Sequence, residues 1–117
     1  MMTLSDAVSA FTTNKVPVAH VRFHGHQQPP YAEAHLNEIQ NHYSDDRISR
    51  TLCEYEFVMH VLDRDLELEA AIEDALDASD ITIEYKSTGH RADEDLVTVT
   101  YRFEVYERDT TKEANNG

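Results

Sequence analysis

The 117-residue sequence has little cysteine, few lysines and no long apolar segment. Its single cysteine, Cys53, excludes an internal disulfide and a zinc site built from several thiolates. No uninterrupted apolar run exceeds three residues, whereas a membrane-spanning helix needs about 20 and the core of a signal peptide about 7. We therefore expect neither a membrane partner nor a cleaved signal peptide.

Positive charge is also scarce, because 10 basic residues stand against 23 acidic ones and the formal net charge is -13 at pH 7. Proteins that wrap nucleic acid draw affinity from Lys and Arg contacts to phosphates, so this balance disfavours that class of protein. Only three of the basic residues are lysines. Such acidity is typical of cytoplasmic proteins from extreme halophiles, and an ordinary protein kept in solution by its net charge is the alternative.

Length and composition indicate one compact domain. A chain of 117 residues has the usual size of a domain, and a hydrophobic fraction of 40% supplies a core. The apolar pattern ends near residue 107. We therefore expect a single domain over residues 1–107 and a polar C-terminal tail over residues 108–117.

Periodicity of the apolar residues predicts two helices and five strands. Helical spacing predicts helices over residues 3–14 and 63–80, the second starting at Asp63 or Asp65. Alternation of apolar and polar residues predicts strands over residues 18–23, 31–36, 51–62, 81–85 and 97–105. Because each strand has one apolar face, we expect an α+β fold in the order α-β-β-β-α-β-β, with a largely antiparallel sheet of about five strands and both helices on one face.

Two polar stretches interrupt this pattern. Residues 37–50 are almost wholly polar, which predicts a long loop, and long loops in compact domains are commonly used for contacts. Residues 87–95 contain a glycine among polar residues, which predicts a turn. On the second helix, eight acidic residues with Arg64 as the compensating cation are expected to face solvent.

The sheet face away from the helices is expected to be wet or to be kept for a partner. His60 and other polar positions of the strand over residues 51–62 lie on that face. Several other outward positions are apolar, which favours partial cover by another subunit: Leu52, Val58, Leu62 and Tyr106.

Seven histidines raise the question of a metal site. His20, His24 and His26 lie on or just after one expected strand, where alternate imidazoles could converge on zinc, although no obvious further ligand completes the set. Surface histidines in water are the simpler interpretation. A small metal-dependent cytoplasmic enzyme or regulator is kept as the alternative from a different class of function.

The carboxylates and the thiol favour no catalytic chemistry. Two pairs of acids are expected in water: Asp63 and Asp65 at a helix start, and Asp45 and Asp46 in the expected loop. A catalytic pair of carboxylates needs a pocket that shifts the pKa of one group away from that of the other, and water provides no such environment. Asp45 and Asp46 could hold a divalent cation, but adjacent acids without a regular ligand pattern are a weak signal. Cys53 falls on the expected core face. We therefore expect no enzymatic activity and no cofactor.

Several short stretches between Leu4 and Glu107 occur in an order that matches one family of structural proteins. They are Val16-Pro17-Val18-Ala19 with Phe23, Pro29-Pro30-Tyr31, Ser44-Asp45-Asp46, Tyr55-Glu56-Phe57 through Leu62-Asp63, Leu66-Glu67 to Leu76, Asp93-Glu94-Asp95-Leu96 and Val99-Thr100-Tyr101-Arg102-Phe103. With this order of elements, the chain resembles the small tail-terminator and tail-completion proteins of long-tailed, siphovirus-like viruses of bacteria and archaea.

The resemblance implies a structural virion protein made in the host cytoplasm. Proteins of that family form a homo-oligomeric ring, commonly a hexamer, at the head-proximal end of the tail tube, where the ring ends tube polymerisation and joins tail to head. The implied partners are further copies of the chain, the tail tube protein and a neck or connector protein, while DNA passes through without specific binding. A neck or head-tail adaptor of similar size is the alternative.

The expected loop supplies our candidate residues for contact with a neighbouring subunit or the tail tube. These residues are His42, Asp45, Asp46, Arg47 and Arg50. A solvated loop without contacts is the alternative. Because like charge on every copy opposes ring closure, we expect assembly to strengthen as added salt screens the repulsion.

Overall fold

The computed structural model describes residues 2–20, 27–44, 47–93 and 95–109, and for residues 41–44, 47–50 and 107–109 it describes the backbone. It contains two helices, α1 (Leu4–Thr12) and α2 (Leu66–Ala78). The strands are β1 (Val18–His20), β2 (Tyr31–Ser44), β3 (Arg47–Val61), β4 (Ile83–Arg91) and β5 (Leu96–Asp109).

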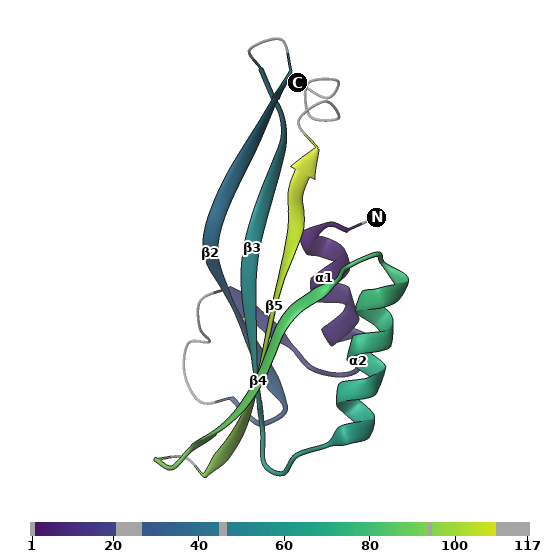
Figure 1. Cartoon of the computed structure of the whole chain (residues 1–117). Coiled ribbons are helices and arrows are strands. Elements are labelled where there is room, and N and C mark those ends of the chain that lie inside the picture. Colours follow the sequence, from purple (N-terminus) through teal and green to yellow (C-terminus); the bar gives the residue numbers. More distant parts are fainter. Residues whose placement is uncertain (1, 21–26, 45–46, 94, 110–117) are drawn as a thin grey trace.

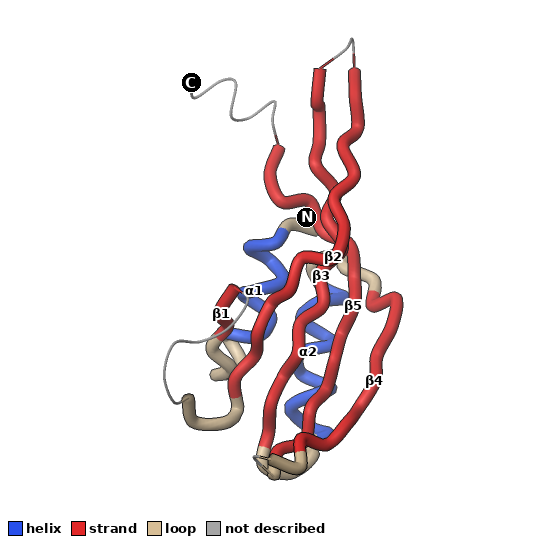
Figure 2. Tube along the Cα trace, turned by 90° about the vertical axis from the view of Figure 1, so that its left-hand side faces the viewer, coloured by secondary structure: helices blue, strands red, loops and turns tan. Residues whose placement is uncertain are grey.

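The five strands form a single sheet in the order β1-β2-β3-β5-β4 (Figure 1). Strand β1 is parallel to β2, and the other neighbouring pairs are antiparallel. Both helices cover the same face of the sheet, as the two side views show (Figures 1 and 2). The expected α+β fold is therefore confirmed, including the order of its elements.

Both helices begin at residues that favour helix starts. Thr3 Oγ1 accepts a hydrogen bond from the Asp6 amide at 3.2 Å, and the Asp6 carboxylate accepts one from the Thr3 amide at 3.1 Å, which makes a capping box. The hydrogen bond from the Thr3 backbone is the main cause that lowers the pKa of Asp6. Asp65 accepts a hydrogen bond from the Leu68 amide at 3.0 Å, so Asp65 caps α2.

The core lies between the helices and the sheet face that they cover. The ring of Phe57 on β3 packs against Phe11 of α1 and Phe103 of β5, with centroids 5.0 and 5.1 Å apart. The alternating β3 residues expected in the core are all buried: Cys53, Tyr55, Phe57, Met59 and Val61. Because burial of a side chain of this size contributes about 2 kcal/mol, a slip of one residue in β3 would be strongly unfavourable.

The expected loop over residues 37–50 is wrong, because this segment continues β2 and β3 as a long hairpin. Glu38 to Ser44 pair antiparallel with Arg47 to Glu54. Backbone hydrogen bonding requires no apolar alternation, and a hairpin that extends past the helices has no core face to keep apolar. Because these residues are polar, their sequence pattern does not indicate that the two strands continue through them.

The expected turn over residues 87–95 is also wrong in extent, because β4 continues to Arg91 and the turn begins at Ala92. Gly89 pairs with Thr98 on β5, and a Cβ added to Gly89 would lie 3.0 Å from Thr98 Oγ1. This glycine therefore permits a close contact between strands and does not make a turn.

Several further boundaries differ from the expectation, among them α1, which covers Leu4–Thr12, and β4, which begins at Ile83. Strand β1 ends at His20, and residues 21–23 of the expected strand lie outside the described residues. Helix α2 begins after Asp65, one of the two expected starts, and ends at Ala78, two residues before the expected end. Strand β5 continues to Asp109, two residues into the expected tail.

Candidate interaction surfaces

The most prominent feature of the molecule is an arm formed by residues 37–44 of β2 and 47–54 of β3, with β5 paired along residues 50–54. The outer part of the arm is two-stranded and projects beyond both helices and the end of β5 (Figures 1 and 2). The molecule is accordingly elongated, with extents of 51 × 29 × 23 Å. A hairpin without a covering layer is marginally stable in water, so the arm is suited to contact with another chain.

Three of the five contact residues predicted from the sequence lie near the end of this arm. His42 pairs with Arg50, and Ser44 pairs with Arg47, in the β2–β3 register. Strand pairing therefore brings His42, Arg47 and Arg50 to one end of the molecule, in a hairpin where a loop was expected. Asp45 and Asp46 lie outside the described residues.

Two apolar side chains of β2 are exposed where the arm meets the body. Leu36 is 45% exposed and Ile39 is 51% exposed. Their register partners on β3, Tyr55 and Cys53, are buried on the helix side of the sheet. Leu36 and Ile39 thus share that side but lie at its uncovered end. The sequence pattern missed Ile39 because this residue fell within the expected loop.

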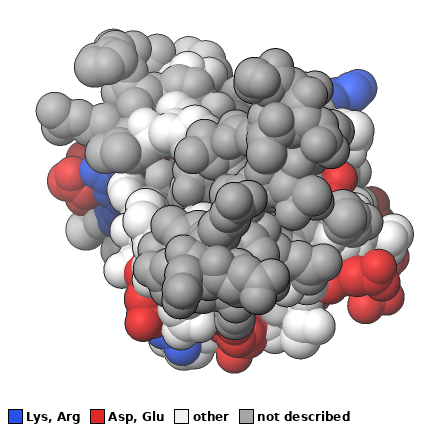
Figure 3. Space-filling view, turned by 90° about the horizontal axis from the view of Figure 1, so that it is seen from above, with Lys and Arg blue, Asp and Glu red and all other residues white. Residues whose placement is uncertain are grey.

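The sheet face opposite the helices carries a row of glutamates. Glu38, Glu54 and Glu104 are successive register partners across β2, β3 and β5. On β4, burial and then the negative charges of Glu104 and Glu54 raise the pKa of Glu84. Like charges in directly opposed positions destabilise a sheet by a few tenths of a kcal/mol each, roughly. Seen from the arm end, the described surface shows more acidic than basic side chains (Figure 3).

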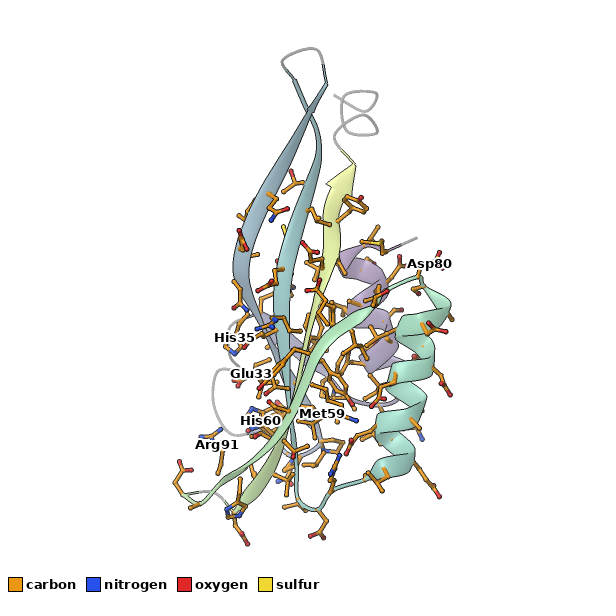
Figure 4. The ribbon with its side chains drawn as sticks, viewed as in Figure 1. Glu33, His35, Met59, His60, Asp80 and Arg91 are labelled. Carbon is orange, nitrogen blue, oxygen red and sulfur yellow. The ribbon has the colours of Figure 1, made fainter. Side chains whose placement is uncertain are left out.

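His60 lies on the same outer face but is only 3% exposed, so the expectation that it faces solvent is wrong. Its ring stacks on Tyr31 with centroids 4.6 Å apart, and its Nε2 lies 3.1 Å from a carboxylate oxygen of Glu33. Figure 4 shows Glu33, His35 and His60 on the side of the sheet away from the helices. The imidazole is a packed part of the sheet. Alternation along one strand carries no signal for this cross-strand stacking.

A buried carboxylate joins α2 to the sheet. Glu69 is 2% exposed, so the expectation that all the acids of this helix face solvent is wrong. Arg64 donates to its two oxygens at 3.1 and 3.2 Å, and Lys86 Nζ of β4 lies 2.9 Å from Glu69 Oε1. Burial acts to raise the pKa of Glu69, but the hydrogen bonds from Arg64 and Lys86 outweigh it and lower the pKa.

Lys86 also connects this carboxylate to a second one. Its Nζ donates to Glu73 at 2.6 Å, and the Tyr101 hydroxyl donates to the same Glu73 oxygen at 2.9 Å. Burial, with this hydrogen bond, raises the pKa of Tyr101 well above its ordinary range. The charged and polar groups of this cluster bind one another between α2, β4 and β5. The arrangement holds the helix on the sheet.

An open hollow of about 160 Å³ is lined by residues of the connection from β3 to α2. That connection lies at the end of the molecule opposite the arm (Figure 1). Its apolar lining consists of Pro29, Pro30, Val61, Leu62 and Leu68. Asp63 and Asp65 complete the lining. Leu62 is 65% exposed and the neighbouring Leu66 is 64% exposed, the largest values among the bulky apolar side chains of the described residues. Apolar surface with acidic neighbours is therefore open to solvent here.

The described part of the structure does not bring the candidate metal ligands together. His20 ends β1, whereas His24 and His26 lie outside the described residues. Within the described parts of the chain, no three His, Cys, Asp or Glu side chains are arranged to hold a metal ion. Cys53 is buried in the core. Neither described helix is long and apolar enough to cross a membrane.

Comparison with known proteins identifies no relative of this chain. No protein-family model matches the chain, and no curated protein is significantly similar to it.

Proposed function

We propose that this chain is a structural virion protein that assembles into a ring, a hexamer, at the head-proximal end of the tail tube of a long-tailed virus. The ring ends tube polymerisation and joins the tail to the head. The observation that carries the proposal is the arm, a hairpin that extends beyond the helical layer and ends in residues with no core to cover. Such an element gains stability by packing on another chain.

Exposed apolar side chains at two separate places on the molecule support self-association. Leu36 and Ile39 are exposed at the base of the arm, and Leu62 and Leu66 are exposed beside the connection from β3 to α2. Contacts between different surfaces of identical subunits run head to tail, and they close into a ring when the rotation between subunits closes. The elongated body suits this arrangement, because its two ends present different surfaces.

The charge of the chain is compatible with a passage for DNA. Six copies at -13 each carry a formal charge of -78. A bore lined by acidic groups repels the phosphate backbone, which favours sliding over binding. The resemblance to tail terminators, which rests on the same order of helices and strands, adds the location at the end of the tail tube.

Localisation by electron microscopy tests this proposal. Antibodies against the chain, carrying gold labels, should mark the junction between head and tail of the particles that contain it. Purified chain should form rings with a central opening wider than duplex DNA. Label spread along the tail or absent from particles, or a chain that stays monomeric at every salt concentration, would contradict the proposal.

A further inference from the structure

We propose that neighbouring copies in the ring join by strand pairing, with the edge strand β4 of one copy antiparallel to residues 38–44 of β2 in the next copy. The two segments belong to opposite edges of the same sheet, so the pairing continues the sheet from one copy to the next. This inference rests on the proposed ring and names the two edges that build it.

Both segments have an edge that no described strand covers. Strand β4 ends the strand order and pairs with β5 alone among the described strands. Strand β1 covers β2 at residues 32–34, and beyond them the described strands give β2 no partner except β3. Neither β4 nor residues 35–44 of β2 contain a proline. Long edges without proline offer their outward N–H and C=O groups to a strand of another chain.

The strand directions suit a contact that repeats around a ring. Strands β2, β3, β5 and β4 are antiparallel at each step, so β4 runs opposite to β2 within one copy. A neighbour related by rotation about an axis roughly along the strands keeps the same orientation. Its β2 therefore meets β4 antiparallel, and the contact repeats because each copy uses one edge of each kind.

The charges of the two edges are complementary when Arg91 lies opposite Glu38. Glu38 is a register partner of Glu54 on the sheet face away from the helices. Lys86 of β4 faces α2, so alternation along β4 places Arg91 on the outer face, as Figure 4 shows. The Arg91 side chain is 37% exposed, and its ion pair with the exposed Asp93 spans 3.5 Å. Opposite charges in directly opposed positions stabilise a pair of strands.

The same register covers an exposed apolar side chain. It places Ile39 opposite His90, on the helix side of the sheet, and residues 40–44 opposite residues 85–89. Ile39 is 51% exposed in its own copy. In the copy that supplies β4, the bond between Lys86 and Glu69 attaches α2 to this side of the sheet. The helical layer of one copy therefore lies beside Ile39 of the next, which lacks such cover in its own copy.

The register also staggers the copies in the way that a closed sheet requires. Within one copy, Gly89 is level with Tyr31 through the register partners Thr98 and His60. Across the contact, Gly89 stands opposite Gln40 of the next copy. Each copy is thus displaced along the strands, and this displacement tilts the strands relative to the axis, as closure of a sheet demands. With the helices outside, the row of glutamates lines the bore.

Cysteine cross-linking tests the contact directly. Ile39→Cys and His90→Cys each add one thiol, while the native Cys53 is buried. In about 1 M salt, which screens the repulsion between copies, an oxidised mixture of the two variants should give a covalent dimer, and neither variant alone should. Opposed Cβ atoms lie about 5 Å apart, close to the span of a disulfide. A mixture of His90→Cys with Thr12→Cys is the control, because Thr12 is exposed on α1, which belongs to neither edge.

Reversal of the paired charges is a second test. At the lowest salt at which the wild type assembles, Glu38→Arg and Arg91→Glu should each weaken self-association by about 5-fold, because each opposes like charges. An equimolar mixture restores opposite charges at every contact when the variants alternate, so association should return to the wild-type level. Asp77→Arg, at an exposed position of α2, changes the net charge as Glu38→Arg does and should not weaken association. Sedimentation velocity measures association, and circular dichroism verifies each fold.

The wild-type chain separates this inference from the proposed function. Wild-type assemblies without a cross-link between Ile39→Cys and His90→Cys, or equal cross-linking in the Thr12→Cys control, overturn this inference alone. So does a disulfide between two His90→Cys chains, which would pair β4 with β4, or a mixture of charge variants that stays weakened. A wild-type chain that is monomeric at every salt concentration overturns both proposals.

Discussion

The carboxylate of Glu69 joins three parts of the fold, because Arg64 precedes α2, Glu69 lies on it and Lys86 belongs to β4. Arg64 and Lys86 stay partly exposed, at 47% and 31%, so water screens them in part. The buried partner is Glu69 itself, and its hydrogen bonds offset the cost of its burial. This single residue therefore carries much of the polar attachment of α2.

Replacement of Glu69 by Gln should lower the free energy of unfolding by about 2 kcal/mol at neutral pH, because the amide cannot pair with both cations. The folded-state pKa of Glu69 is lowered, so the unfolded chain binds more protons and the contribution is lost as pH falls below the ordinary value of 4.5. Denaturant unfolding at about pH 7 and about pH 3 measures the difference, which should shrink in acid. Glu67→Gln, an exposed position on the same helix, is the control. An equal loss at both pH values would contradict this assignment.

Sequence patterns could predict which apolar residues of α2 are buried, but not which of its acidic residues is buried. Ile72 and Leu76 are fully buried, as their helical spacing indicates. Burial of Glu69 depends on Lys86, which a distant strand brings to it, and burial of His60 depends on Tyr31 of a neighbouring strand. Local periodicity contains no information on such partners.

At the scale of whole elements, the arm is where sequence and structure diverge most. The strands under the helices follow the predicted alternation because one of their faces is in the core. Beyond the helices that requirement ends, and polar residues continue the same strands through backbone pairing. Of the contact residues placed in the expected loop, His42, Arg47 and Arg50 are still close together, because a hairpin, like a loop, brings the two halves of the segment to one end.

An arm shortened at its tip should fold but fail to assemble. Replacing residues 41–51 by Asn-Gly leaves Gln40 and Leu52, which are register partners, flanking a two-residue hairpin turn. The free energy of unfolding should change by less than about 1 kcal/mol, because the removed residues pair only with one another and with the end of β5 among the described strands. Light scattering after size exclusion measures the mass. Assemblies of wild-type size would show that the arm is not the docking element.

At the scale of the whole molecule, electrostatic repulsion between copies opposes assembly. Each copy carries a formal charge of -13, so copies repel one another over their whole surfaces. Salt screens this repulsion, whereas the apolar part of a contact between copies is not screened. Assembly should therefore strengthen in salt.

The most direct test of the ring is the sedimentation of the wild-type chain as ionic strength rises from about 0.1 M to about 1 M, over which the screening length falls from about 10 Å to about 3 Å. We predict that the population shifts from monomers to one closed species of fixed mass, while circular dichroism shows an unchanged fold. A folded chain that remains monomeric throughout, or assemblies that dissociate as salt rises, would contradict the account.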